Sequence, residues 1–293
     1  SNIIKFFKGD IRNINCIENI FNYARDKGLS VDVVFYFAGL KSVRESELIP
    51  NKYWDVNVNG TKVLLDAMES NNCRNIIFSS SATVYGNKGL AIIEETCEIN
   101  PTNTYGKTKA FAEELLLERY NISKNWKIVN LRYFNPIGAH KSYLLGENSK
   151  NNFHNLFPIL CKVANKEIEH LEIFGNDWET KDGTCIRDFV HIIDIAEGHI
   201  SALKYILKNK SFYLSINLGT SKGTTILELI NAFKTSTRHK VDYVFGNRSD
   251  GDVASYVASN NMAKIYLNWS PQFNLNEMCI DGWNWYIKRK SNL

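Results

Sequence analysis

The first half of the chain alternates between short apolar runs and longer stretches with apolar residues at helical spacing. Val31–Ala38 is a continuous apolar run, and Ile76-Ile77-Phe78 forms another. Such runs are typical of parallel strands that are buried on both faces. The first helical stretch ends at Gly28, a residue type that commonly terminates helices. The pattern predicts strand Ile3–Asp10, helix Ile14–Lys27, strand Val31–Ala38, helix Pro50–Ser70, strand Asn75–Ser80, helix Tyr105–Tyr120 and strand Lys127–Phe134, in that order.

Strands that alternate with helices form right-handed β-α-β units, which assemble into a doubly wound parallel sheet. The sequence therefore predicts a Rossmann-type α/β fold. In sheets of this kind the ligand crevice lies outside the carboxyl ends of the strands. Asp10, Ala38-Gly39 and Ser79-Ser80-Ser81 all stand at such ends, so we expect a cofactor to bind there.

The character of the chain changes after Pro136, where a polar, asparagine-rich stretch runs from Ser142 to Asn155. We interpret this stretch as the start of a smaller α/β substrate domain. The remaining pattern predicts helix Leu156–Val163, strand Leu171–Gly175, a helix from an N-cap at Asp194 to about Lys204, strand Tyr213–Leu218 and helix Ile226–Lys234.

Composition narrows the classes of function. A chain of 293 residues with 44% hydrophobic content can hold one large or two ordinary domains. The net charge of +4 is dispersed, so nucleic acid is not an expected partner. No stretch approaches the roughly 18 apolar residues of a membrane span. The cysteines and histidines lack the spacing of metal ligands or paired thiols, so we expect a cytoplasmic protein with reduced thiols and no metal site.

Two polar segments carry the candidate chemistry. Ser81 follows a predicted strand, whereas Tyr105 and Lys109 stand four residues apart at the start of a predicted helix. This spacing places the two side chains on one helix face, about 5–6 Å apart at Cβ. A nearby ammonium lowers the pKa of a phenol, so Tyr105 can exchange protons near neutral pH. Alone, such a pair is usually an ordinary helix face, and a serine-rich strand end is usually a turn; their combination favours catalysis.

Together these segments resemble the Ser/Thr and Tyr-x-x-x-Lys centre of the extended short-chain dehydrogenase/reductase family. Longer matches over Phe37–Ser46 and Leu131–Pro136 are similar to the UDP-glucose (UDP-galactose) 4-epimerases of that family, and the similarity continues to about Trp285. The resemblance implies NAD as cofactor, a UDP-hexose as substrate and a homodimer. The implied reaction oxidises sugar C4 to a ketone and reduces it again from the other face.

The resemblance also implies a role for individual residues. The catalytic residues are Tyr105 as the acid/base at O4, Lys109 as its pKa depressor and ribose ligand, and Ser81 as its hydrogen-bond partner. The cofactor-binding residues are Asp10, Ile11, Phe37, Ala38, Gly39, Lys41, Asn57, Ser79, Tyr105, Lys109 and Phe134. The substrate-binding residues are Lys41, Ser81, Tyr105, Asn135, Asn155, Leu156, Phe174, Arg187, Arg248, Asp252 and Tyr256.

Three of these substrate positions bear on how the UDP-sugar is bound and which sugars are accepted. Arg187 suits a diphosphate, because a guanidinium can bind it in a bidentate manner; a salt bridge to Asp188 or Asp182 is the alternative. Arg248 stands one residue early relative to the arginine of the family. Tyr256 stands where a bulky side chain excludes an N-acetyl group on the sugar, so we expect plain hexoses as substrates.

The resemblance further implies a division into two domains. Residues 1–135 with about 187–219 form the NAD-binding domain, and about 136–186 with 220–293 form the UDP-sugar-binding domain. A dinucleotide fold opens with a glycine-rich turn, and the sequence contains none. We therefore expect an N-terminally truncated sheet, with Ser1 at the position of the third strand.

Two other functions compete with epimerisation. A nucleotide-sugar 4,6-dehydratase needs an Asp-Glu pair after the serine or threonine, and Ala82-Thr83 stand there instead. A truncated, catalytically inactive UDP-sugar-binding relative is the second alternative. The intact Ser81, Tyr105 and Lys109 argue against it.

Overall fold

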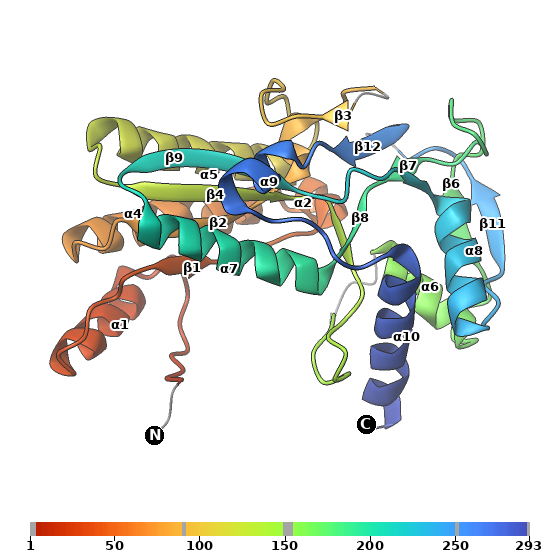
Figure 1. Cartoon of the computed structure of the whole chain (residues 1–293), viewed down its shortest axis with the longest axis horizontal. Coiled ribbons are helices and arrows are strands. Elements are labelled where there is room, and N and C mark those ends of the chain that lie inside the picture. Colours follow the sequence, from red (N-terminus) through yellow and green to blue (C-terminus); the bar gives the residue numbers. More distant parts are fainter. Residues whose placement is uncertain (1–3, 90–91, 149–154, 250–251, 292–293) are drawn as a thin grey trace. The chain divides into compact units, whose positions relative to one another are not determined.

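The computed structural model describes residues 4–89, 92–148, 155–249 and 252–291 (Figure 1). The chain divides into two compact units. The first unit comprises residues 1–86, 99–131 and 202–215, and the second comprises residues 87–98, 132–201 and 216–293. None of the helices in the described ranges is long and apolar enough to cross a bilayer.

A four-stranded sheet has the order β1-β2-β4-β9, and β1 and β2 run parallel with Tyr36 beside Phe78. This parallel sheet with its helices confirms the predicted α/β fold. Its strands are β1 (Val34–Tyr36), β2 (Asn75–Ser81), β4 (Lys127–Tyr133) and β9 (Phe212–Leu218). The helices among residues 1–131 are α1 (Ile14–Asp26), α2 (Val43–Leu48), α3 (Pro50–Trp54), α4 (Gly60–Ser70) and α5 (Thr104–Ile122), with the π-helical turn η1 (Asp55–Asn59) and the 3₁₀ turn η2 (Ala82–Tyr85).

In the core of the first unit, buried side chains of the predicted helices and strands pack against one another. Trp126, Phe78 and Leu116 are almost fully buried in it, together with Met68 and Ile76. Burying side chains of this size contributes about 1.5–3 kcal/mol each. The predicted helix Pro50–Ser70 contains α3, η1 and α4, so the helical path continues but loosens at η1.

The second unit contains short strands and four complete helices among its described residues. Its strands are β3 (Ile92–Ile93), β5 (Asn135–Ile137), β6 (Leu171–Phe174), β7 (Ile186–Arg187), β8 (Phe189–His191), β10 (Thr224–Thr225), β11 (Tyr243–Gly246) and β12 (Ser255–Ala258). Its helices are α6 (Leu156–Ala164), α8 (Ile226–Thr237), α9 (Asn261–Leu267) and α10 (Leu275–Ser291); α7 (Ile192–Lys208) belongs to both units. Its core includes Leu160, Ile173, Phe233, Cys279 and Trp283.

Two predictions of secondary structure are wrong. The described part of the predicted strand Ile3–Asp10 is not a strand; Ile4 is 84% exposed and Phe6 is 81% exposed. No described strand pairs with this segment, and an extended segment without a ladder partner is not a strand. Asp194 is not the N-cap of a helix, because α7 begins at Ile192 and Asp194 lies within its first turn. Its carboxylate accepts hydrogen bonds from the backbone N–H groups of Gln272 and Phe273.

Candidate active site

The end of β2 positions Ser81. Its Oγ accepts hydrogen bonds from the backbone N–H of Thr83 at 3.3 Å and from the Thr83 hydroxyl at 2.9 Å. The turn after η2 closes at Gly86, whose φ is +65°. A Cβ at this position would overlap the carbonyl oxygen of Asn100, so the turn that fixes Ser81 requires glycine.

The start of α5 positions Tyr105 and Lys109. Asn103 caps the helix by accepting from the N–H of Gly106 at 2.8 Å, and the N–H of Tyr105 donates to Ser46 Oγ at 3.1 Å. Such caps satisfy N–H groups that have no partner within the helix. The first turn of α5 is therefore held from two sides.

The structure brings the three predicted catalytic residues together in the first unit. The Tyr105 hydroxyl hydrogen-bonds Ser81. Lys109 Nζ lies 5.9 Å from the centroid of the Tyr105 ring and donates to the carbonyl oxygen of Ser79 at 2.9 Å. The contacts with Ser81 and Ser79 join the end of β2 to the first turns of α5. The arrangement places a phenol, a hydroxyl and an ammonium at one strand end.

Burial dominates the protonation of this centre. Burial raises the pKa of Tyr105 to about 12, although the hydrogen bond from Ser81 lowers it. The predicted lowering of this pKa is therefore wrong for the protein alone: the phenol is out of water, and the Lys109 ammonium donates to Ser79. Burial lowers the pKa of Lys109 to about 8, and the charge of Glu113 acts in the opposite direction. Near neutral pH, Tyr105 is thus a neutral phenol beside a charged Lys109.

The residues at the end of β1 fit a dinucleotide. A Cβ on Gly39 would lie 3.0 Å from Asn57 Oδ1 and 3.6 Å from Lys109 Nζ, so the bare backbone leaves this space open. Asn57 is buried and bonds to both backbone groups of Leu40 and to the Thr108 hydroxyl. Glycine at such a point permits close approach of a ligand to the backbone.

The other predicted cofactor residues of the first unit are placed as follows. Phe37, Ala38 and Lys41 are exposed, and Ser79 is buried with its carbonyl bound to Lys109. Asp10 is bound by Arg12, whose guanidinium holds the pKa of Asp10 well below its usual range. The side chain of Ile11 would contact a Cβ placed on Gly60, so Ile11 packs directly on α4.

In the second unit, Arg187 is bound neither to Asp188 nor to Asp182. Its guanidinium forms an ion pair with Asp252 and donates to the carbonyl oxygens of Ile186 and Val253. The two predicted substrate residues Arg187 and Asp252 are therefore brought together. This pairing corrects the alternative partners considered from the sequence.

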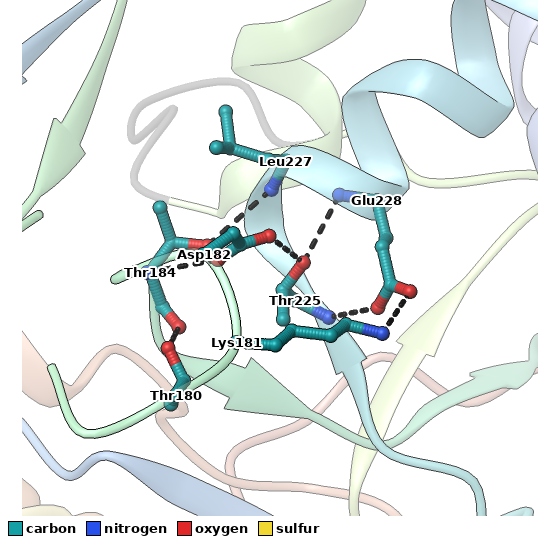
Figure 2. Close-up of polar contacts among 7 residues, drawn as sticks. All are labelled: Thr180, Lys181, Asp182, Thr184, Thr225, Leu227 and Glu228. Carbon is teal, nitrogen blue, oxygen red and sulfur yellow. Dashed lines mark hydrogen bonds and ion pairs between the residues drawn. The ribbon is translucent and has the colours of Figure 1, made fainter.

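Figure 2 shows how the segment before Arg187 is anchored. Asp182 accepts hydrogen bonds from the Thr184 N–H at 2.9 Å and from the Thr225 hydroxyl at 2.5 Å. Thr225 and Glu228 form a capping box at the start of α8. Because Thr224 of β10 pairs with Arg187 of β7, this cluster fixes the backbone that carries the arginine.

The remaining substrate residues of the second unit lie on several of its strands, helices and loops. Tyr256 of β12 is the strand partner of Arg187, and its ring centroid lies 5.8 Å from that of Phe134. Arg248 donates to Asp177 and lies over the Trp178 ring, whose Nε1 donates to the carbonyl of Phe174. Asn135 begins β5, Leu156 begins α6, and the exposed Asn155 donates to Glu147.

Sequence reasoning missed two buried polar residues beside this chemistry, Glu113 and Asp188. Glu113 accepts from Ser80, and Asp188 accepts four hydrogen bonds from Thr220, Ser221 and Ala258. The signal for Glu113 was present, because it continues the four-residue spacing of Tyr105 and Lys109. Asp188 directly follows Arg187, but nothing in its sequence neighbourhood reveals the four donors.

Comparison with known proteins gives consistent matches. The chain matches the NAD dependent epimerase/dehydratase family over residues 1–219. It is 43% identical to the bifunctional protein GAL10 of Pachysolen tannophilus, covering 97% of this chain and 42% of that protein. It is 41% identical to UDP-glucose 4-epimerase 4 of Oryza sativa subsp. japonica, covering 97% and 76%.

A solved structure extends the likeness to the fold. The crystal structure of UDP-glucose-4-epimerase from Stenotrophomonas maltophila, with bound NAD and formylated UDP-arabinopyranose, is 36% identical with a TM-score of 0.93. The match covers 97% of this chain and 83% of that one. The similarity therefore includes both units of the chain.

Proposed function

Because the chain belongs to the NAD dependent epimerase/dehydratase family, we propose that it interconverts UDP-glucose and UDP-galactose by inverting C4 of the hexose. The observation that carries this proposal is the contact between the Tyr105 hydroxyl and Ser81, with the Lys109 ammonium beside the ring. A phenol and a hydroxyl in contact can share one substrate oxygen. That arrangement suits the transfer of a proton at O4.

Each residue of the centre has a separate task in this reaction. When bound, NAD supplies the hydride chemistry at C4, through which a 4-keto sugar forms and is reduced on its other face. In its phenolate form, Tyr105 accepts the O4 proton as the carbonyl forms, and the resulting phenol returns that proton when the alcohol forms again. Ser81 holds the same oxygen, and Lys109 favours the anionic form of the phenol through its charge.

The second unit supplies residues suited to the nucleotide. Arg187 presents a planar guanidinium that suits the diphosphate, and Asp252 holds it in orientation. A firm hold on UDP leaves the hexose free to turn between the two half-reactions. We assign NAD binding to residues 1–135 with 187–219, and UDP-sugar binding to residues 136–186 with 220–293.

The direct test is conversion of UDP-galactose by the purified chain in the presence of NAD, followed by NMR of the anomeric protons. We expect UDP-glucose to form, and the same mixture to be reached from either sugar. A 4-keto-6-deoxy product would identify a dehydratase instead. Binding of UDP-galactose without any conversion would identify an inactive sugar-binding relative.

Sugar selectivity is assigned to Tyr256. Tyr256 pairs with Arg187 on the neighbouring strand, and its ring approaches Phe134, which supports a steric role near the nucleotide-binding arginine. We expect natural Tyr256 to exclude UDP-N-acetylglucosamine and Tyr256→Ser to admit it, because a filled pocket discriminates by steric exclusion. The measurement is kcat/KM for the acetylated and plain sugars with both proteins. Equal efficiency on both sugars before the substitution contradicts this assignment, as does no gain after it.

We further propose that the chain forms a homodimer through α3, α4 and α5. These helices line a groove of about 740 Å³ in the first unit, in which Trp54 and Phe111 are partly exposed and in edge-to-face contact. Lys62 and Glu118 also line it, and their opposite charges suit contact with a second copy across a two-fold axis.

The oligomeric state is measured by sedimentation velocity. We expect a dimer for the natural chain and a monomer for Phe111→Glu, because a buried unpaired carboxylate is costly. Leu207→Glu, at an exposed position of α7, is the matched control and is expected to remain a dimer. A monomeric natural chain contradicts the proposal.

A cytoplasmic location is proposed from the thiols. All six cysteines are free, and four of them are buried. Free thiols of this kind persist in reducing compartments. Fractionation of cells that express the protein tests this location.

A further inference from the structure

A buried carboxylate lies one helical turn beyond Lys109. Glu113 is 5% exposed, and one of its carboxylate oxygens accepts a 2.5 Å hydrogen bond from Ser80 Oγ. Tyr105, Lys109 and Glu113 follow one another at four-residue intervals along α5, so they lie on one face. The backbone carbonyl of Glu113 also accepts from the Tyr213 hydroxyl. The turn of α5 that carries Glu113 is thus fixed on two sides.

Lys109 needs such a partner because its surroundings are dry. It is 5% exposed, with Nζ 4.8 Å from the centroid of Phe78 and 2.9 Å from the carbonyl oxygen of Ser79. A carbonyl and a ring compensate an ammonium only in part. Burial lowers the pKa of Lys109 to about 8, and Glu113 is the charged group that opposes this effect.

The other charged groups around α5 are engaged elsewhere. Glu47 of α2 accepts from the N–H of Thr104 at the helix start, and Asp55 of η1 is bound by Arg12. The two acids of α4 that contact α5, Asp66 and Glu69, both pair with Arg119 near its far end. The phenols near this face of α5 include Tyr105 on the helix itself and Tyr213 on β9. Tyr85 lies in η2, which packs on α5, and the Tyr36 ring contacts Phe78, over which Lys109 lies. Glu113, one turn from Lys109 on the same face of α5, is the acid whose charge acts on the lysine.

We propose that Glu113 is a positioning residue of the epimerase centre: its carboxylate, oriented by Ser80, keeps the Lys109 ammonium charged beside Tyr105. The effect on catalysis rests on the proposed function. The effect of Glu113 on the charge of Lys109 does not depend on that function. The buried acid acts on the proton shuttle through the lysine.

The consequence has a definite sign. The pKa of Lys109 is lower in the folded chain than its ordinary value of 10.5, so the folded state releases this proton first. Stability therefore rises with pH from about 8 until the unfolded chain also loses the proton near 10.5. Replacing Glu113 by Gln removes the opposing charge. We expect the lysine titration to move to lower pH by roughly one unit.

The test follows the ¹³Cε signal of Lys109 against pH, assigned by its disappearance in Lys109→Met. We expect a midpoint near 8 in the natural chain and in Glu114→Gln, the matched control at the exposed neighbouring acid. In Glu113→Gln the midpoint should fall by about one unit. Glu113→Asp, which keeps the charge, should restore most of the shift and serves if the glutamine variant fails to fold.

Epimerase assays add a second readout. We expect the alkaline limb of kcat to move to lower pH in Glu113→Gln by the same amount as the lysine midpoint. An unchanged lysine midpoint overturns the inference, and so does a loss of kcat that is equal at every pH. A shifted midpoint in a chain without epimerase activity supports the electrostatic coupling and overturns the proposed function.

Discussion

Tyr105→Phe is expected to lower kcat by about 10²–10⁴-fold while leaving the affinity for UDP unchanged. The substitution removes only the hydroxyl that contacts Ser81, and with it the group that accepts the O4 proton. The ring stays in place, because its packing does not depend on the oxygen. The measurements are steady-state kinetics with UDP-galactose and calorimetric titration with UDP.

Tyr120→Phe is the matched control for this variant. Tyr120 lies on the same helix, and its ring contacts Tyr213 and Lys124 rather than Ser81. We expect its kcat to equal that of the natural chain. Near-normal turnover of Tyr105→Phe would reject Tyr105 as the proton shuttle.

Asp188→Asn is expected to lower the free energy of unfolding by about 4 kcal/mol, because two of the four donors around the buried carboxylate lose an acceptor at roughly 1–3 kcal/mol each. One carboxylate oxygen of Asp188 accepts from the N–H and hydroxyl of Thr220, and the other accepts from the N–H groups of Ser221 and Ala258. An amide presents an NH₂ group to one of these donor pairs. Urea unfolding of both proteins measures the difference.

The control for Asp188 is Asp242→Asn. Asp242 is exposed and pairs with Lys240 at the surface, where such pairs contribute about 0–1 kcal/mol. We expect its unfolding curve to lie close to that of the natural chain. A loss below 1 kcal/mol in Asp188→Asn would show that the four bonds adapt to an amide.

The protein alone holds Tyr105 as a neutral phenol, whereas the reaction uses the phenolate as a base. Burial raises the pKa of this phenol to about 12, so its proton leaves only with help from positive charge. Lys109 is the positive group of the centre, and its own pKa of about 8 lies close to neutrality. Activity should therefore be sensitive to any change that discharges the lysine, which links the Tyr105 and Glu113 predictions.

The sequence alone determined the features that follow from local patterns of residues. Helix α1 was predictable because its apolar residues recur at helical spacing, and strand β2 was predictable because it contains a continuous apolar run. The shared face of Tyr105 and Lys109 follows from their four-residue spacing, whatever the rest of the fold does. Family resemblance then attached a role to each residue, including Arg187 and Tyr256.

Tertiary structure alone decided features that depend on distant partners. The predicted strand at Ile3–Asp10 fails because a strand exists only where another strand pairs with it. Asn57, within the π-helical turn η1, bonds to Leu40 and to Thr108, 51 residues away in sequence.

The partner of Arg187 is Asp252, 65 residues away, and neither the adjacent Asp188 nor Asp182. The direction of the Tyr105 pKa shift was wrong from sequence for the same reason. Spacing reports that a charge is near, but only the fold determines how much water is excluded and which acceptor the ammonium chooses.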